Sequence, residues 1–81
     1  MKAEIKKEVY SIFNKSFGYD IKDIEEKETL KHDLALDSLD ILALEMELET
    51  YFGPLPNLDE LCCNPKTTVG DLLDFLCKAK S

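Results

Sequence analysis

Apolar residues recur at helical spacing near the start of the chain, and this periodicity constrains the fold more than any other feature. Over a segment from about Ala3 to Phe17 they fall at positions i, i+4, i+7 and i+8, which places them on one face of a helix. These residues are Ile5, Val9, Ile12 and Phe13. Gly18 supplies the stop expected just past the C-terminus of a helix. The segment therefore predicts an amphipathic helix that buries one face.

The segment from Ser38 to Tyr51 or Phe52 is also expected to be helical, but it carries two apolar faces. Because each residue advances about 100° around a helix, one face consists of Ile41, Leu44, Leu48, Tyr51 and Phe52, and the other of Leu39, Leu42 and Met46. Acids separate the faces: Asp40 and Glu47 on one flank, Glu45 and Glu49 on the other. We expect the first face to be buried and the second to be an exposed docking strip with an acidic rim. Burial of both faces is the alternative.

Two more helices are expected downstream. A short turn is expected in "NLDELCC", with Asn57 as its cap. In "TTVGDLLDFLCKAK", Thr68 is the expected N-cap, and Asp71 completes a variant of the capping box. The inward stripe of this last helix consists of Val69, Leu72, Leu73 and Leu76.

A long connection, residues 19–37, separates the first two helices, and loops of this length are usually functional or partly structured. Its apolar residues are expected to hold it against the core; they are Ile24, Leu30, Leu34 and Leu36. The stretch "KDIEEKETL" could itself form a helical turn, which the sequence does not decide. Without a convincing strand, the predicted class is all-α: a small four-helix bundle of three longer helices and one short helix, with residues 1–81 as a single domain.

The charge of the chain limits its partners. The formal net charge of −7 disfavours nucleic acid and anionic lipid, and it favours basic patches on other proteins. No apolar run approaches the roughly 20 residues needed to span a bilayer, so membrane insertion is not expected. The start, "MKAEIKKEVYS", does not have the pattern of a secretory signal. An acidic docking protein is the class that remains.

The cysteines are Cys62, Cys63 and Cys77. Their number is odd and two are adjacent, so we predict no metal site and expect them to behave as small buried hydrophobes. Free cysteines favour a reducing, cytoplasmic setting. The single histidine, His32, is expected at the surface.

Ser38 is expected at the first position of its helix, with Asp37 as the N-cap. The positive end of the helix dipole and the unpaired N–H groups there favour an anion attached to the serine. A catalytic serine would need a positioned base and an oxyanion hole, and the chain offers only His32 and no G-x-S-x-G motif. Enzymatic activity is therefore not predicted.

The segment "DLALDSLD" resembles the phosphopantetheine attachment motif of acyl carrier proteins, whose hallmark is D-S-L-D preceded by D-L-G-x. The resemblance extends over nearly the whole chain, including the serine helix ending "ETYFG" and the segment "TTVGDLLDFL". It implies a four-helix fold and a 4'-phosphopantetheine arm, donated by coenzyme A, on Ser38. A phosphopantetheinyl transferase would attach the arm, and acyl intermediates of fatty acid, lipid or polyketide-type synthesis would be carried on it as thioesters.

The resemblance also implies a partner-binding face for the transferase and for acyl-processing enzymes with basic docking patches. It comprises Asp37, Leu39, Asp40, Leu42 and Met46, to which the acids Glu45 and Glu49 of the rim are added. A monomer is expected.

Several positions depart from the family pattern. Ala35 stands where glycine is usual, a change expected to alter the loop that presents Ser38. Ala43 replaces a common glutamate, Glu45 takes a usually apolar position, and Lys66 stands where isoleucine often precedes T-T-V. The segment "GPLPNLDELCCNPK" is longer than usual. Together these departures suggest a dedicated carrier in place of a housekeeping fatty-acid carrier.

Three alternatives remain open. The chain could be a helical adaptor that docks through the second helix and never carries the arm, with Ser38 as a phosphorylation site. It could be a peptidyl or aminoacyl carrier, although the D-S-L context favours acyl carriers. A small hydrolase using Ser38 is the third.

Overall fold

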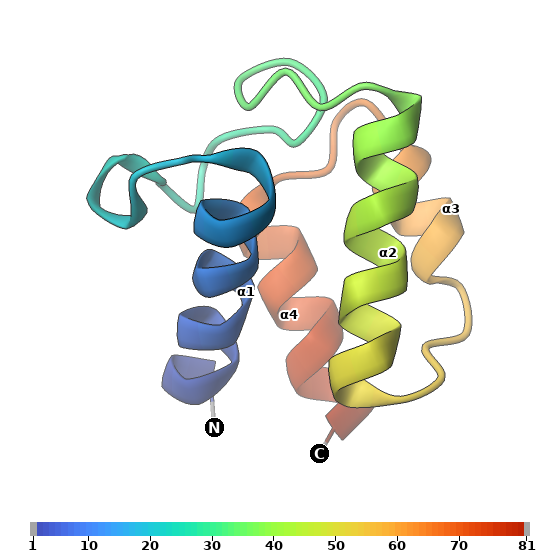
Figure 1. Ribbon diagram of the computed structural model, residues 1–81. Helices are drawn as coiled ribbons and strands as arrows, with labels where there is room; N and C mark the ends of the chain where they lie inside the picture. Colours follow the sequence, from blue (N-terminus) through green and yellow to red (C-terminus); the bar gives the residue numbers. More distant parts are fainter. Residues whose placement is uncertain (1, 81) are drawn as a thin grey trace.

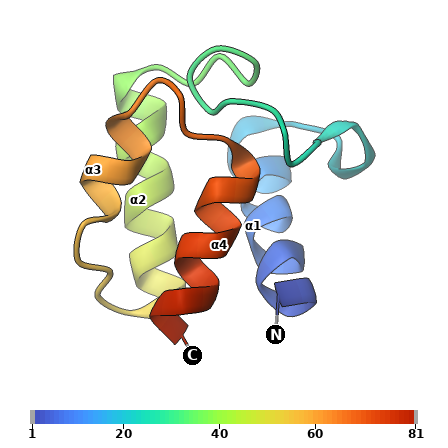
Figure 2. The same cartoon turned by 180° about the vertical axis from the view of Figure 1, so that it is seen from behind.

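The computed structural model describes residues 2–80, which form four α-helices and one short 3₁₀ helix around a shared core (Figure 1). The elements in chain order are α1 (Lys2–Phe17), η1 (Ile21–Asp23), α2 (Ser38–Phe52), α3 (Leu58–Cys63) and α4 (Val69–Lys80). Helix α1 runs opposite to α2 and α4, and α3 packs against α2 (Figures 1 and 2). No strand occurs within residues 2–80, so the predicted all-α class is confirmed. No helix in this range is long and apolar enough to cross a membrane.

The core is built from the predicted apolar stripes. On α1 the buried residues are Ile5, Val9, Tyr10 and Phe13, whereas Ile12 is only half-buried. On α4 they are Val69, Leu72, Leu73 and Leu76, as predicted. Helices α1 and α4 pack side by side, so these two stripes face each other across the core.

The ends of the helices follow their local sequences in all but one case. Helix α1 stops at Gly18, which has a φ of 75°, as the prediction requires. At α4, the N–H of Thr68 donates to the Asp71 carboxylate and the N–H of Asp71 donates to the Thr68 hydroxyl, both at 3.1 Å. Asn57 is the N-cap residue of α3, as predicted, but it does not cap the helix through its side chain. Its backbone is left-handed, with φ 71°, and its side chain makes no capping bond, because capping geometry requires an extended residue.

Helix α2 separates its two apolar faces as predicted, with one exception. Ile41, Leu44 and Leu48 are buried, and Leu39, Leu42 and Met46 are 75%, 53% and 61% exposed. Tyr51, expected on the buried face, is 58% exposed. At the C-terminal end of α2 the half-buried ring of Phe52 packs against the core, and Tyr51 lies edge-on to it, with ring centroids 4.7 Å apart.

The long connection between α1 and α2 is ordered by burial. Its four apolar residues are all buried, as predicted; they are Ile24, Leu30, Leu34 and Leu36. Of the stretch that could have formed a helical turn, only Lys22 and Asp23 lie in η1. The hydroxyl of Tyr19 donates to the carbonyl of Leu34, which ties the end of this loop to its beginning.

The same loop is hydrogen-bonded to the start of α4. The N–H groups of Val69 and Gly70 donate to the carbonyls of Glu28 and Glu26, each at 2.8 Å, and the N–H of Leu30 donates to Thr67 at 3.0 Å. A Cβ on Gly70 would lie 3.2 Å from the Glu26 carbonyl oxygen, which is closer than an ordinary van der Waals contact, so glycine suits this close approach. These contacts satisfy helix-terminal N–H groups and fix the loop that leads into α2.

Ala35 lies in this loop with a φ of 54°, in the left-handed region. Although alanine replaces the usual glycine here, the backbone keeps the conformation that glycine would favour. This conformation strains Ala35 by about 1 kcal/mol. Because Ala35 is exposed, no packing offsets this strain.

We predict that Ala35→Gly raises the free energy of unfolding by about 0.5 kcal/mol, since relief of strain outweighs the greater freedom of glycine in the unfolded chain. Urea denaturation followed by circular dichroism measures the change. Ala43→Gly is the matched control, because Ala43 is exposed within α2, and it should lower stability by about 1 kcal/mol. Equal losses in both variants would show that Ala35 is not strained.

Candidate functional site

Ser38 is the first residue of α2, and its side chain is exposed. Asp37 is the N-cap, as the sequence predicts. Its carboxylate accepts the N–H of Asp40 at 2.8 Å, and the Asp40 carboxylate accepts the N–H of Asp37 at 3.2 Å. The sequence analysis did not foresee this return bond from Asp40. The reciprocal pair holds the first turn of α2 rigidly on both sides of the serine.

The capping pair leaves two backbone donors beside the serine hydroxyl. Within residues 2–80, no acceptor is bonded to the N–H groups of Ser38 and Leu39. These groups lie at the positive end of the helix dipole, where an anion is stabilised. A phosphodiester on Ser38 would therefore meet favourable electrostatics from the backbone, despite the two neighbouring carboxylates.

A surface groove of about 230 Å³ begins at Ser38 and runs between α2 and α3. Its lining comprises Lys31, Ser38, Ile41, Leu42, Glu45, Asp59 and Cys63. Lys31 adds a cation near the serine, and the exposed flank of Leu42 adds apolar surface. The groove therefore suits a flexible arm with a phosphate at one end, and the residues present fit a phosphopantetheine group on Ser38.

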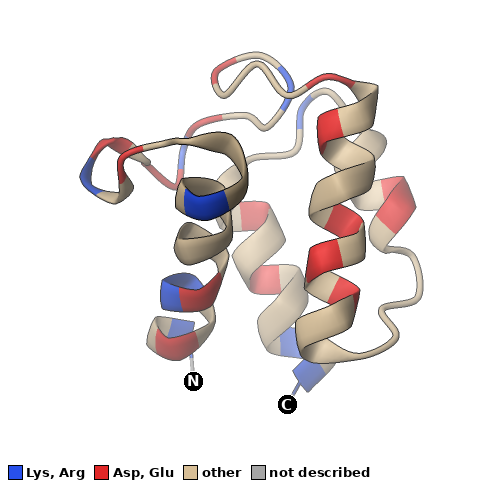
Figure 3. Cartoon of the chain, in the orientation of Figure 1, with Lys and Arg blue, Asp and Glu red and all other residues tan. Residues whose placement is uncertain are grey.

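The docking strip, defined as Leu39, Leu42 and Met46, lies next to this serine and is exposed along its length. Helix α2 carries acids and no lysine or arginine, whereas lysines occur on α1, in the loops and at the end of α4 (Figure 3). Of the acids flanking the strip, Glu49 is exposed and its carboxylate accepts the N–H of Leu55 at 3.3 Å. Glu47 accepts a hydrogen bond from the hydroxyl of Ser16. The strip is thus an apolar surface with an acidic rim.

Glu45 does not belong to this rim, and the expectation that it does is wrong. Its side chain is buried, with 8% exposure, because α3 packs over that flank of α2. Burial raises the pKa of the Glu45 carboxyl, and the nearby Asp59 carboxyl raises it further. Glu45 therefore faces the groove and α3.

Three groove residues were missed by the sequence analysis: Lys31, Asp59 and Cys63. The signal for two of them is present, because Asp59 and Cys63 are four residues apart on α3 and so share one face. The cysteines differ in environment. Cys62 is buried as expected, and burial raises its pKa to about 12, whereas Cys63 is exposed and Cys77 is half-buried. His32 is exposed, as expected.

Comparison with known proteins agrees with this geometry. A family model described as the phosphopantetheine attachment site matches residues 7–76, a range that includes Ser38, α2 and α3. An acyl carrier protein of Thermotoga maritima is 34% identical over 75 residues, which cover 93% of this chain and 90% of that protein.

Both matches extend over most of the chain, and they confirm the resemblance seen in the sequence. The cofactor of this family is phosphopantetheine, and its members work with phosphopantetheinyl transferases and acyl-handling enzymes. The chain belongs to the acyl carrier proteins, which are carriers of acyl groups and not enzymes.

Proposed function

We propose that Ser38 is the residue that carries 4'-phosphopantetheine, and that residues 1–81 act as a single carrier domain. The observation that carries this proposal is the exposed hydroxyl of Ser38 at the first position of α2, within the sequence DSLD. When bound, the arm supplies a thiol on which acyl groups of fatty acid, lipid or polyketide-type synthesis travel as thioesters. No second serine occurs in α2, which supports Ser38 as the attachment residue.

The residues of this chain have a passive but specific task at the site. The Ser38 oxygen only has to be reachable, since the transferase supplies the base that removes its proton and the magnesium that activates coenzyme A. The capping pair of Asp37 and Asp40 holds the oxygen at the helix tip. The N–H groups of Ser38 and Leu39 then face the phosphodiester, and Lys31 lines the groove along which the arm can lie.

We further propose that the transferase and the acyl-processing enzymes dock on the strip of Leu39, Leu42 and Met46 and on its acidic rim. Charge complementarity supports basic patches on those partners, because α2 has no cation and the chain carries a net charge of −7. The strip then adds apolar contact, and a flexible methionine suits a surface that meets several partners. The same net charge disfavours nucleic acid as a partner.

The remaining assignments are also proposals. A net charge of −7 opposes self-association and supports a monomer. Free cysteines support a cytoplasmic location. The charged residues that line the groove, among them Glu45 at a usually apolar position, support a dedicated carrier with its own partner enzymes.

The attachment site is tested by incubating the protein with coenzyme A, magnesium and a broad-specificity phosphopantetheinyl transferase. The intact mass should increase by one phosphopantetheine, and Ser38→Ala should abolish the increase. Ser11→Ala, at a half-buried serine of α1, is the matched control and should be modified as the unaltered protein is. A folded, unaltered protein that several transferases leave unmodified would instead favour the adaptor function, and phosphate on Ser38 in protein from its host would establish it.

The docking strip is tested with the double variant Leu39→Ala/Met46→Ala. Both side chains are mostly exposed, so the free energy of unfolding should change by less than about 0.5 kcal/mol. The kcat/KM of the transferase should fall by about tenfold or more, since buried apolar contacts at a docking surface contribute about 1 kcal/mol or more. Ile21→Ala removes a comparably exposed apolar side chain from η1 and should leave kcat/KM unchanged. A similar fall in kcat/KM for the double variant and for Ile21→Ala would mean that the strip is not the docking site.

A further inference from the structure

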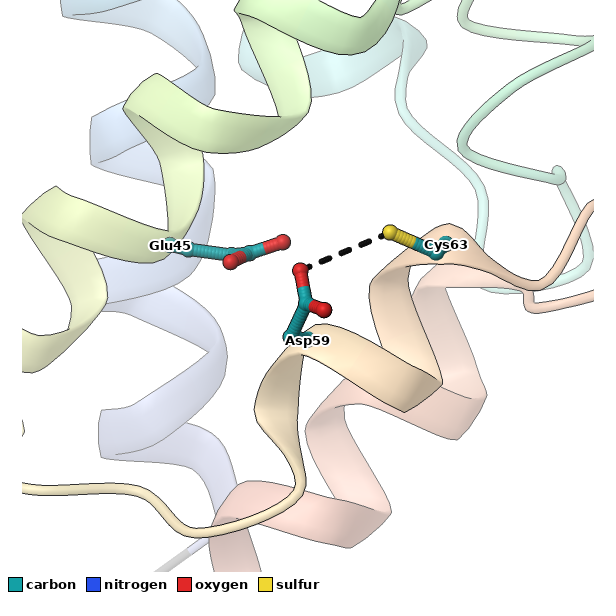
Figure 4. Close-up of side chains that lie close together, drawn as sticks. All are labelled: Glu45, Asp59 and Cys63. Carbon is teal, nitrogen blue, oxygen red and sulfur yellow. Dashed lines mark hydrogen bonds between the residues drawn. The ribbon is translucent and has the colours of Figure 1, made fainter.

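Glu45, Asp59 and Cys63 converge in the groove between α2 and α3 (Figure 4). One ligand atom from each side chain lies within 4.8 Å of the other two. Asp59 and Cys63 come from the same face of α3, where the thiol donates to the Asp59 carboxylate at 3.5 Å. Glu45 reaches toward them from α2. The cluster therefore joins two helices through three side chains that can all be anionic.

Glu45 has no cationic partner among residues 2–80, and the Asp59 carboxyl is its only side-chain hydrogen-bond partner. Its side chain is 8% exposed, and Figure 4 shows its carboxyl directed at Asp59. Among residues 2–80, no lysine, hydroxyl or N–H group donates to it, and Asp59 can share a hydrogen bond with it only if one carboxyl keeps a proton. Two carboxylates that face each other repel unless a proton or a cation lies between them.

We propose that Glu45, Asp59 and Cys63 bind a borderline divalent cation of the Zn²⁺ class, with water completing its coordination. A cation at this point would neutralise the convergent carboxylates and would take the place of the proton that Glu45 and Asp59 otherwise share. Lys31 also lines the groove, but its one positive charge does not balance the three negative charges of the ligands when all of them are ionised.

The donor set and its spacing suit zinc. Bonds of about 2.3 Å to sulfur and about 2.0–2.2 Å to oxygen place tetrahedral ligands roughly 3.5 Å apart, so a contraction of about 1 Å is needed. All three ligand atoms are at the ends of rotatable side chains, and Cys63 is exposed, so the contraction can occur without movement of the helices. The thiolate favours Zn²⁺ over Mg²⁺ and Ca²⁺, which prefer oxygen ligands in larger number.

Such a site would add a function to the carrier surface. The cation would hold the short helix α3 against α2 beside Ser38, and would cover the thiol of Cys63. This inference does not depend on modification of Ser38, because all three ligands are present in the unmodified chain.

The test uses the untagged full chain, freed of metal by a chelator and kept reduced with a phosphine, which does not compete for the ion as a thiol would. Calorimetric titration with zinc chloride should give one Zn²⁺ per chain, and a large excess of Mg²⁺ should not displace it. Cobalt chloride should produce a near-ultraviolet thiolate-to-Co²⁺ charge-transfer band, which reports the Cys63 ligand directly.

Glu45→Gln and Cys63→Ser should each weaken Zn²⁺ binding by at least about tenfold, because even outer-shell partners of metal ligands contribute that much. The cobalt band should disappear in Cys63→Ser. Glu60→Gln, next to Asp59 on α3, and Cys77→Ser on α4 are matched controls that should bind as the unaltered chain does. Circular dichroism verifies that each variant is folded. The proposal is overturned if Zn²⁺ does not bind saturably, or if folded Glu45→Gln and Cys63→Ser bind it as tightly as their controls.

Discussion

The hydrogen bonds from the first turn of α4 to the carbonyls of Glu26 and Glu28 connect the two halves of the molecule. They satisfy N–H groups that a helix end leaves unpaired, and they fix the long loop between α1 and α2. The buried leucines of that loop hold it against the core as far as Leu36. Asp37, the next residue, caps α2. The position of the Ser38 hydroxyl therefore depends on hydrogen bonds made by the start of α4, far along the sequence. The long connection between α1 and α2 is as much a part of the scaffold as the helices are.

Helix α2 divides three tasks among its sides. Ile41, Leu44 and Leu48 complete the core, the strip containing Leu39 faces outward, and Glu45 lies beneath α3. A helix in a small domain can do this only because its neighbours cover part of its circumference. The acids of α2, which has no lysine or arginine, would attract a basic partner before contact (Figure 3).

The sequence was sufficient for most features that depend on local spacing or local chemistry, although the side-chain cap at Asn57 was wrong and the return bond from Asp40 was missed. Periodicity predicted the stripes of α1 and α4, and the residue types at Asp37 and Thr68 predicted their caps. Features that depend on a neighbouring element could not be predicted. Glu45 and Glu49 lie on the same flank of α2, yet only Glu45 is buried, because α3 covers only part of that flank. The spacing of residues in α2 does not indicate how far α3 extends over it. The proximity of Glu45 to Cys63 has the same origin, since it arises from packing between helices.

Gly70 makes the approach between α4 and the loop possible, since a Cβ there would press on the Glu26 carbonyl oxygen from 3.2 Å. A side chain at this position would require the loop to give way by a few tenths of an ångström, in the segment that leads to the tip of α2. An inherited change at residue 70 can therefore impair a carrier whose DSLD signature is intact. For chains of this kind, inspection of the serine motif alone is an incomplete guide to which natural variants remain competent.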